Sequence, residues 1–183
     1  MDFPLVQGGA PISGTVTDAC QGLPLTGAQV FLAELGIFAL TDGVGAFLIP
    51  GMHPDDRYTV RATMQNFVLS GRLYDLVGSA APNPLSFSLV PVALAPTSIA
   101  CKSMKNKFLV ETDRIYEFKW EASPRGCLIG YRISRDGKEI GFIPASGPLQ
   151  YSDSVRFNKS HEYSVQAINS FGEVSPPLKI TVL

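Results

Sequence analysis

Ile115-Tyr-Glu-Phe-Lys-Trp-Glu121 alternates strictly between large apolar and charged residues. In an extended chain Tyr116, Phe118 and Trp120 lie on one side and the charged residues on the other, a period of two that is typical of a half-buried β-strand. The stretch His161-Glu-Tyr-Ser-Val-Gln-Ala167 repeats the pattern further along. A tryptophan strand followed by such a tyrosine strand predicts a sandwich of two β-sheets.

The length and composition of the chain favour two domains of similar size. Its 183 residues exceed one small sandwich, and 45% of them are hydrophobic, so each half can fill a core of its own. Residues 1–95 carry three Arg, no Lys and seven acidic residues, whereas residues 96–183 carry seven Lys, five Arg and nine acidic residues. We therefore predict one domain over 1–95 and another over 96–183, joined stiffly by the short, apolar, proline-bounded segment 91–96.

The first half consists of short segments with alternating apolar residues, separated by turn residues. No segment of useful length shows the apolar period of three to four residues that a helix needs. Asp42, Gly43 and Gly45 stand where a hairpin requires positive backbone φ. The expected strands are residues 12–16, 28–32, 47–49, 57–62 and 85–89. The predicted fold class is all-β, with two tandem antiparallel β-sandwiches.

The order and spacing of residues in the first half are similar to those of a known family. Four motifs carry the similarity: Gly14-x-Val16-x-Asp18, Leu23-Pro-Leu25-x-Gly27-Ala28-x-Val30, Thr41-Asp42-x-x-Gly45-x-Phe47 and Tyr58-x-Val60-x-Ala62. Residues 10–92 resemble a carboxypeptidase regulatory-like domain of the transthyretin-like (prealbumin-like) type. The resemblance implies a seven-stranded sandwich that occurs beside catalytic domains and within large secreted or surface proteins, and that carries no catalytic residues itself.

Residues 96–183 resemble a fibronectin type III domain, which is an immunoglobulin-like sandwich. Trp120 stands where that family has its second-strand tryptophan, and Gly130 to Lys138 looks like the third strand with an Asp136-Gly137 turn. Tyr163 stands at the tyrosine-corner position, which implies a buried ring and a hydroxyl bonded to upstream backbone. Phe157-Asn-Lys-Ser160 departs from the Leu-x-Pro-Gly that usually precedes this tyrosine, and the departure concerns the turn rather than the fold.

The residues with acid–base or metal-binding chemistry do not form a catalytic set. The two imidazoles, His53 and His161, fall in different predicted domains, and no Gly-x-Ser-x-Gly elbow is present. We interpret both as solvated loop histidines. His53 could act as a metal ligand together with Asp55 and Asp56, but Pro54 and the two aspartates are ordinary turn residues. The sequence therefore indicates no enzyme, and we assign no catalytic residue, cofactor-binding residue, cofactor or metal site.

Charge and hydropathy bear on the class of partner. Lys102, Lys105 and Lys107 form a basic cluster without interleaved aromatics, which is typical of a solvated face and not of a nucleic-acid site. The net charge of −1 favours the same interpretation. The longest apolar run, residues 89–95, is interrupted by Pro91 and is too short to span a membrane.

Two groups of residues are each consistent with two interpretations. Phe38, Phe67, Leu69 and Tyr74 could form a stacking platform for a glycan or a groove for a partner strand, or they could be core and interdomain packing. Cys101 and Cys127 fall in the same predicted domain, so a bridge between them and buried free thiols are both consistent with the sequence.

The leading functional hypothesis is a pair of non-enzymatic structural or binding modules, acting as a spacer, in adhesion or in protein–protein interaction. The alternatives are the accessory region of a secreted hydrolase and a glycan-binding module. We expect a protein or glycan partner, no nucleic acid, no membrane insertion by this segment, and further domains in the same polypeptide. No signal peptide is present in the given residues, and we expect an extracellular or cell-surface location. The sequence identifies no ligand-binding residue.

Overall fold

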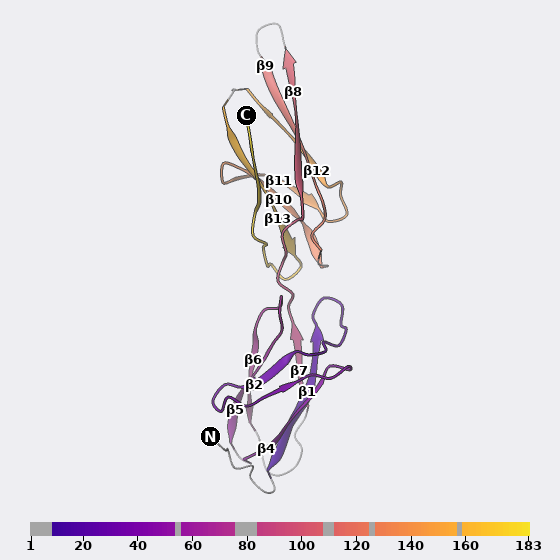
Figure 1. Cartoon of the computed structure of the whole chain (residues 1–183), viewed down its shortest axis with the longest axis vertical. Coiled ribbons are helices and arrows are strands. Elements are labelled where there is room, and N and C mark those ends of the chain that lie inside the picture. The colour runs from indigo at the N-terminus through magenta and orange to yellow at the C-terminus, as the bar shows by residue number, and fades with distance from the viewer. Residues whose placement is uncertain (1–8, 54–55, 76–83, 108–111, 125–126, 157–158) are drawn as a thin grey trace. The chain divides into compact units, whose positions relative to one another are not determined.

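The computed structural model describes residues 9–53, 56–75, 84–107, 112–124, 127–156 and 159–183. The chain divides into two compact units, residues 1–91 and residues 92–183. Every regular element within the described ranges is a β-strand, which confirms the predicted all-β class (Figure 1). Those ranges accordingly contain no helix with the length and apolar character needed to cross a membrane.

The described residues of the first unit form a three-stranded and a four-stranded sheet. The strand orders are β4-β1-β7 and β3-β2-β5-β6. The strands are β1 (Ala10–Asp18), β2 (Gln29–Leu32), β3 (Phe38–Leu40), β4 (Ala46–Met52), β5 (Arg57–Thr63), β6 (Ser70–Asp75) and β7 (Leu85–Leu89). This is the seven-stranded sandwich that the resemblance implied.

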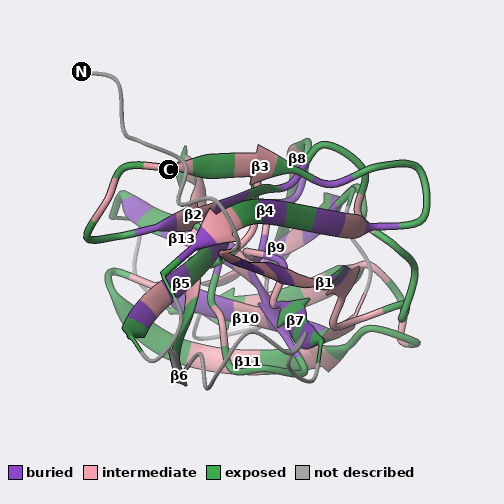
Figure 2. Cartoon of the chain, turned by 90° about the horizontal axis from the view of Figure 1, so that it is seen from below, coloured by how far each residue is buried: buried purple, intermediate pink, exposed green. Residues whose placement is uncertain are grey.

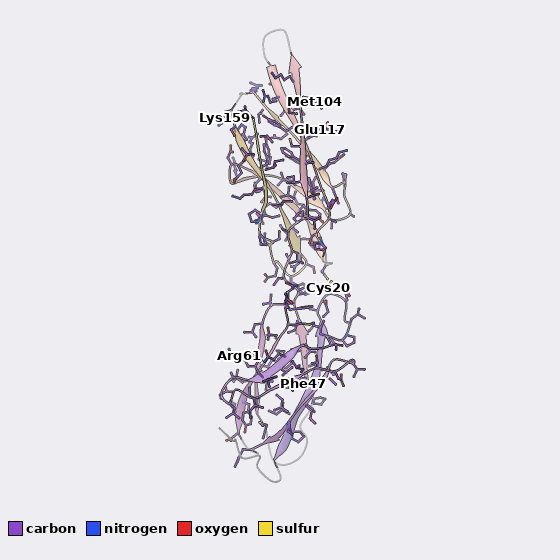
Figure 3. All side chains as sticks on the ribbon, in the orientation of Figure 1. Cys20, Phe47, Arg61, Met104, Glu117 and Lys159 are labelled. Atoms are coloured by element: carbon purple, nitrogen blue, oxygen red, sulfur yellow. The ribbon has the colours of Figure 1, made fainter. Side chains whose placement is uncertain are left out.

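A period of two places the core of this unit between its sheets. Leu85, Phe87 and Leu89 of β7 are buried while the serines between them are exposed. The same alternation of buried and exposed residues runs along β4 and β5 (Figure 2). The ring of Phe47, labelled in Figure 3, lies 6.3 Å from that of Phe87. Each such buried side chain contributes roughly 1.5–3 kcal/mol of transfer free energy.

One strand pair departs from the antiparallel arrangement of the others. β7 runs parallel to β1, with Gly14 opposite Leu85, whereas β4 pairs antiparallel along the other edge of β1. A Cβ at Gly14 would collide with the Leu85 carbonyl, so glycine permits this approach. The alternation of apolar residues cannot reveal strand direction, because it is the same in parallel and antiparallel pairs.

The turn at Asp42 connects the two sheets rather than two strands of one hairpin, because β3 and β4 belong to different sheets. The Asp42 carboxylate accepts hydrogen bonds from the backbone N–H of Val44 and of Ala46, at 3.0 and 2.8 Å. Gly45 has the predicted positive φ, 73°, whereas Gly43 does not.

The second unit also consists of two sheets, and all its described strand pairs are antiparallel. The strand orders are β12-β9-β8 and β11-β10-β13-β14. The strands are β8 (Ile99–Lys107), β9 (Thr112–Trp120), β10 (Leu128–Arg135), β11 (Lys138–Pro144), β12 (Gln150–Val155), β13 (His161–Asn169) and β14 (Leu178–Val182).

Aromatic residues from β9 and β13 fill the core of the second unit, as the sequence predicts. The buried residues of the two predicted faces are Tyr116, Phe118, Trp120, Tyr163, Val165 and Ala167. Trp120 packs against Tyr131 with ring centroids 5.7 Å apart. Asp136 and Gly137, with φ of 50° and 80°, form the predicted tight turn between β10 and β11.

Trp120→Ala is expected to lower the free energy of unfolding of the second unit by about 3–5 kcal/mol, because it empties a core position. Scanning calorimetry of the full chain measures this without relying on tryptophan fluorescence. Phe171→Ala is the control, since that ring is 43% exposed and its loss should change the free energy by less than about 0.5 kcal/mol. Equal effects of the two substitutions would contradict the core position of Trp120.

Candidate functional site

The four-stranded sheet of the first unit exposes apolar side chains on the side that faces away from the core. Val30 and Leu32 of β2 are buried, so Gln29 and Phe31 point to the opposite side. The register then aligns Phe31 with its neighbours on β3 and β5. We call this surface the outer face; its residues are Gln29, Phe31, Phe38, Leu40, Thr59, Arg61, Thr63, Gly71 and Leu73.

Large apolar side chains on the outer face remain open to solvent. Phe38, Leu40 and Leu73 are 57%, 60% and 69% exposed, and Phe31 is half-buried. Arg61, labelled in Figure 3, leans over Gly71, because its Cγ lies 3.3 Å from the position that a Cβ there would occupy. A group of exposed apolar residues on a sheet whose other face is already filled is typical of a binding surface.

A shallow hollow of about 600 Å³ lies at one end of the outer face. Its lining residues are Gly27, Gln29, Leu40, Thr63, Met64 and Gln65. The ladder places Gln29 directly opposite both Leu40 of β3 and Thr63 of β5, so three adjacent strands contribute to it. The described lining residues include no charged side chain and offer two side-chain amides, one hydroxyl and two apolar side chains.

The structure separates the aromatic and aliphatic group that the sequence singled out. Phe38 lies on the outer face, whereas Phe67 packs against the core and pairs with Pro91 in an isolated bridge. Leu69 is 52% exposed and directly precedes β6. The side chain of Tyr74 lies outside the described part of the chain. The packing interpretation therefore holds for Phe67, whereas Phe38 is exposed.

The two histidines lie in different environments. His53 is exposed, and its Nδ1 lies 3.7 Å from the Asp56 carboxylate, while Asp55 lies outside the described residues. The prediction of a solvated histidine is wrong for His161, which is buried with its Nδ1 2.7 Å from Asp136 Oδ2. The tight turn of the β10–β11 hairpin brings that carboxylate to the first residue of β13. Within the described ranges, no group of three or more His, Cys, Asp and Glu side chains is placed to hold a metal.

The Tyr163 hydroxyl takes a different partner from the one predicted. It donates to Asp153 Oδ2 at 2.6 Å rather than to backbone, and Arg135 donates to the same oxygen at 2.6 Å. Burial and the neighbouring Asp153 carboxylate raise the pKa of the Tyr163 hydroxyl. The phenol is therefore held protonated, and the cluster links β10, β12 and β13 as a structural element.

The lysine cluster lies on an exposed strand. Lys102 and Lys105 of β8 are exposed, and the register sets Lys102 opposite Glu117 of β9. The Lys107 side chain lies outside the described part of the chain. The arrangement of Lys102 and Lys105 agrees with the solvated face that the sequence predicts.

The structure assigns a free thiol to Cys101 alone, which excludes a Cys101–Cys127 bridge. Cys101 lies on β8 and is half-buried rather than buried. Burial raises the pKa of its thiol, so the thiolate that would be reactive is disfavoured.

Comparison with known protein families gives a match within the first half. Residues 11–89 match the carboxypeptidase regulatory-like domain family, as their motifs predict. No curated protein matches the sequence.

Several solved structures share low identity with the chain. A candidate carbohydrate-binding protein from Bacteroides uniformis is 14% identical, with 94% of this chain and 99% of that one covered and a TM-score of 0.36. A DUF3823 family protein from Bacteroides ovatus is 6% identical, with 96% and 100% covered and a TM-score of 0.35. Fibronectin(III)-like modules of Clostridium thermocellum CbhA are 17% identical, with 94% and 90% covered and a TM-score of 0.34.

The Asp136–His161 pair predicts a pH dependence of stability. The hydrogen bond from His161, followed by that from the Glu162 backbone, lowers the pKa of Asp136 from its usual 3.8. A carboxyl with a lowered folded-state pKa stabilises the fold above its usual pKa and ceases to do so as the pH falls through the folded value. Asp136→Asn should therefore lower the melting temperature at neutral pH, and the difference from the parent chain should shrink on acidification below about pH 4.

Thermal melts between neutral and acidic pH measure this difference. Glu139→Gln is the matched control, because it removes one carboxylate from the same hairpin and that side chain is 55% exposed in its pairing with Arg132. We expect it to change stability little at any pH. A deficit of Asp136→Asn that stayed constant across the pH range would contradict the role of the charge.

Proposed function

We propose that this chain is a pair of non-enzymatic modules of a larger secreted or cell-surface protein, and that it binds its partner through the outer face of the first unit. The observation that carries the proposal is the exposure of Phe38, Leu40 and Leu73 on one sheet face. These side chains are not needed to fill the core, which already packs against the other side of the sheet. Covering them with a partner removes apolar surface from water and is therefore favourable.

The second unit suits the role of a fibronectin type III spacer or interaction module. Its strand orders β12-β9-β8 and β11-β10-β13-β14, with Trp120 buried in β9 and Tyr163 buried in β13, support that assignment. We retain 1–95 and 96–183 as the proposed limits of the two domains.

The environment of the described imidazoles supports the non-enzymatic interpretation. His161 is buried against Asp136, and His53 is exposed beside Asp56. The family match of residues 11–89 is to a regulatory-like domain and not to a catalytic one.

The same family match favours a second candidate function. A carboxypeptidase regulatory-like domain is named for its place beside an enzyme, so the chain could serve as the accessory region of a secreted hydrolase. On this alternative the natural polypeptide contains a catalytic domain contiguous with these residues.

The native polypeptide is expected to be much larger than 19.7 kDa and to lie outside the cytoplasm. An antibody raised against this chain, applied to secreted, surface and cytoplasmic fractions of the source cells, measures both properties. External protease should remove the surface signal while a cytoplasmic marker survives. A species of 19.7 kDa confined to the cytoplasm would sink the secreted or surface assignment.

Binding through the outer face is tested by co-sedimentation of the purified chain with envelopes of the source cells. The double variant Phe38→Ser, Leu73→Ser should sediment severalfold less than the parent chain, because it removes two exposed apolar contacts from the outer face. The matched control is Leu23→Ser, Leu48→Ser, since both leucines are 57% exposed but lie elsewhere on the first unit. Equal sedimentation of the two double variants would reject the outer face as the binding surface.

A further inference from the structure

We propose that the hollow at the end of the outer face binds a neutral carbohydrate. This inference rests on the proposed function, because it names the ligand class for part of the same surface. Its support comes from the lining residues Gln29, Leu40, Thr63, Met64 and Gln65.

The absence of charge in the lining selects for an uncharged ligand. None of the described residues that line the hollow is acidic or basic. A carboxylate, phosphate or ammonium group placed there would lose water without gaining a counter-charge, which is unfavourable. The ligand that suits this hollow is therefore polar but neutral.

The polar side chains of the hollow match the hydroxyl groups of a sugar. The amides of Gln29 and Gln65 each carry donors and an acceptor, and the Thr63 hydroxyl both donates and accepts. Sugar hydroxyls have the same dual character, so neighbouring hydroxyls on a ring can satisfy all three side chains. An acyl chain would cover these groups and leave them without partners, which costs free energy.

The apolar part of the hollow gives a surface for the C–H face of a sugar ring. Leu40 and Met64 contribute this surface, and Phe38, two residues before Leu40 on the same side of β3, extends it along the strand. A pyranose ring is polar around its rim and less polar on its face, so apolar and polar contacts fit together at one ring. A volume of about 600 Å³ accommodates a short oligosaccharide segment.

The hollow is also held in place before any ligand binds. Gln29, Leu40 and Thr63 belong to three strands paired in one antiparallel ladder. Positions fixed by a sheet lose little backbone entropy on binding, which favours even a small ligand that makes few contacts.

Isothermal titration calorimetry of the full chain with neutral hexasaccharides tests the proposal. The probes are linear β-1,4-linked glucose, β-1,4-linked mannose and α-1,4-linked glucose oligomers, with an α-1,4-linked galacturonate oligomer as the anionic comparison. We expect saturable binding of at least one neutral probe and weaker or no binding of the anionic one. Gln29→Ala and Gln65→Ala should each weaken the affinity about tenfold.

Gln21→Ala is the matched control, because this glutamine is exposed in the loop between β1 and β2 of the same unit and lies outside the hollow. It should leave the affinity unchanged, and all three variants should keep the parent melting temperature. The proposal is overturned if no neutral probe binds, if only the galacturonate oligomer binds, or if the variants of Gln29 and Gln65 bind like that of Gln21.

These outcomes are separable from a failure of the proposed function. If envelope binding depends on Phe38 and Leu73 while no neutral probe binds, the outer face contacts another kind of partner and only the carbohydrate proposal fails. If a neutral probe binds through Gln29 and Gln65 while the two apolar double variants sediment alike, the hollow stands and the wider outer face is rejected.

Discussion

The hydrogen bonds of Thr41 fix the geometry on which the first unit and its hollow depend. The buried Thr41 hydroxyl accepts from the Ala28 N–H at 2.9 Å and donates to the Leu25 carbonyl. The Thr41 backbone donates to the Ala28 carbonyl and accepts from the Gly27 N–H. This one residue therefore ties the start of β2 to the end of β3, and the register that follows sets Gln29 opposite Leu40. Gln29 and Leu40 lie side by side because the buried Thr41 forms the hydrogen bonds that the neighbouring backbone groups need.

Period-two patterns in the sequence predict cores well, because burial of a strand face depends only on alternate residues of that strand. Tyr116, Phe118 and Trp120 are buried as that rule predicts. The outer face could not be predicted in the same way. Its residues come from separate strands, and only the cross-strand register places Gln29 between Leu40 and Thr63. The predicted strand 28–32 indicates on which side of the sheet Phe31 lies, but it does not indicate which residues of other strands lie beside Phe31.

The environments of two polar residues were predicted wrongly for one physical reason. In each case the side chain has a partner that is distant along the chain. His161 is buried because a hairpin turn supplies the Asp136 carboxylate, and the Tyr163 hydroxyl meets Asp153 of β12 instead of nearby backbone. A buried polar group must be paired to be tolerated, but the sequence does not show which partner will reach it. Local patterns therefore gave the position of the Tyr163 ring and not the bond of its hydroxyl.

The family motifs and the residues of the hollow have different roles in the first unit. Motif residues such as Thr41, Gly45 and Phe47 lie in the core or in turns, where they hold the two sheets together. The side chains of the hollow occupy positions that the motifs leave open: Gln29 lies between Ala28 and Val30, Leu40 precedes Thr41, and residues 63–65 follow Ala62. The scaffold thus determines where the hollow lies, whereas its chemistry is set by residues that the scaffold does not constrain. Two uncharged amides and a hydroxyl beside apolar side chains are accordingly a property of this chain rather than of the fold, and they are the reason that we propose a neutral, hydroxyl-rich ligand.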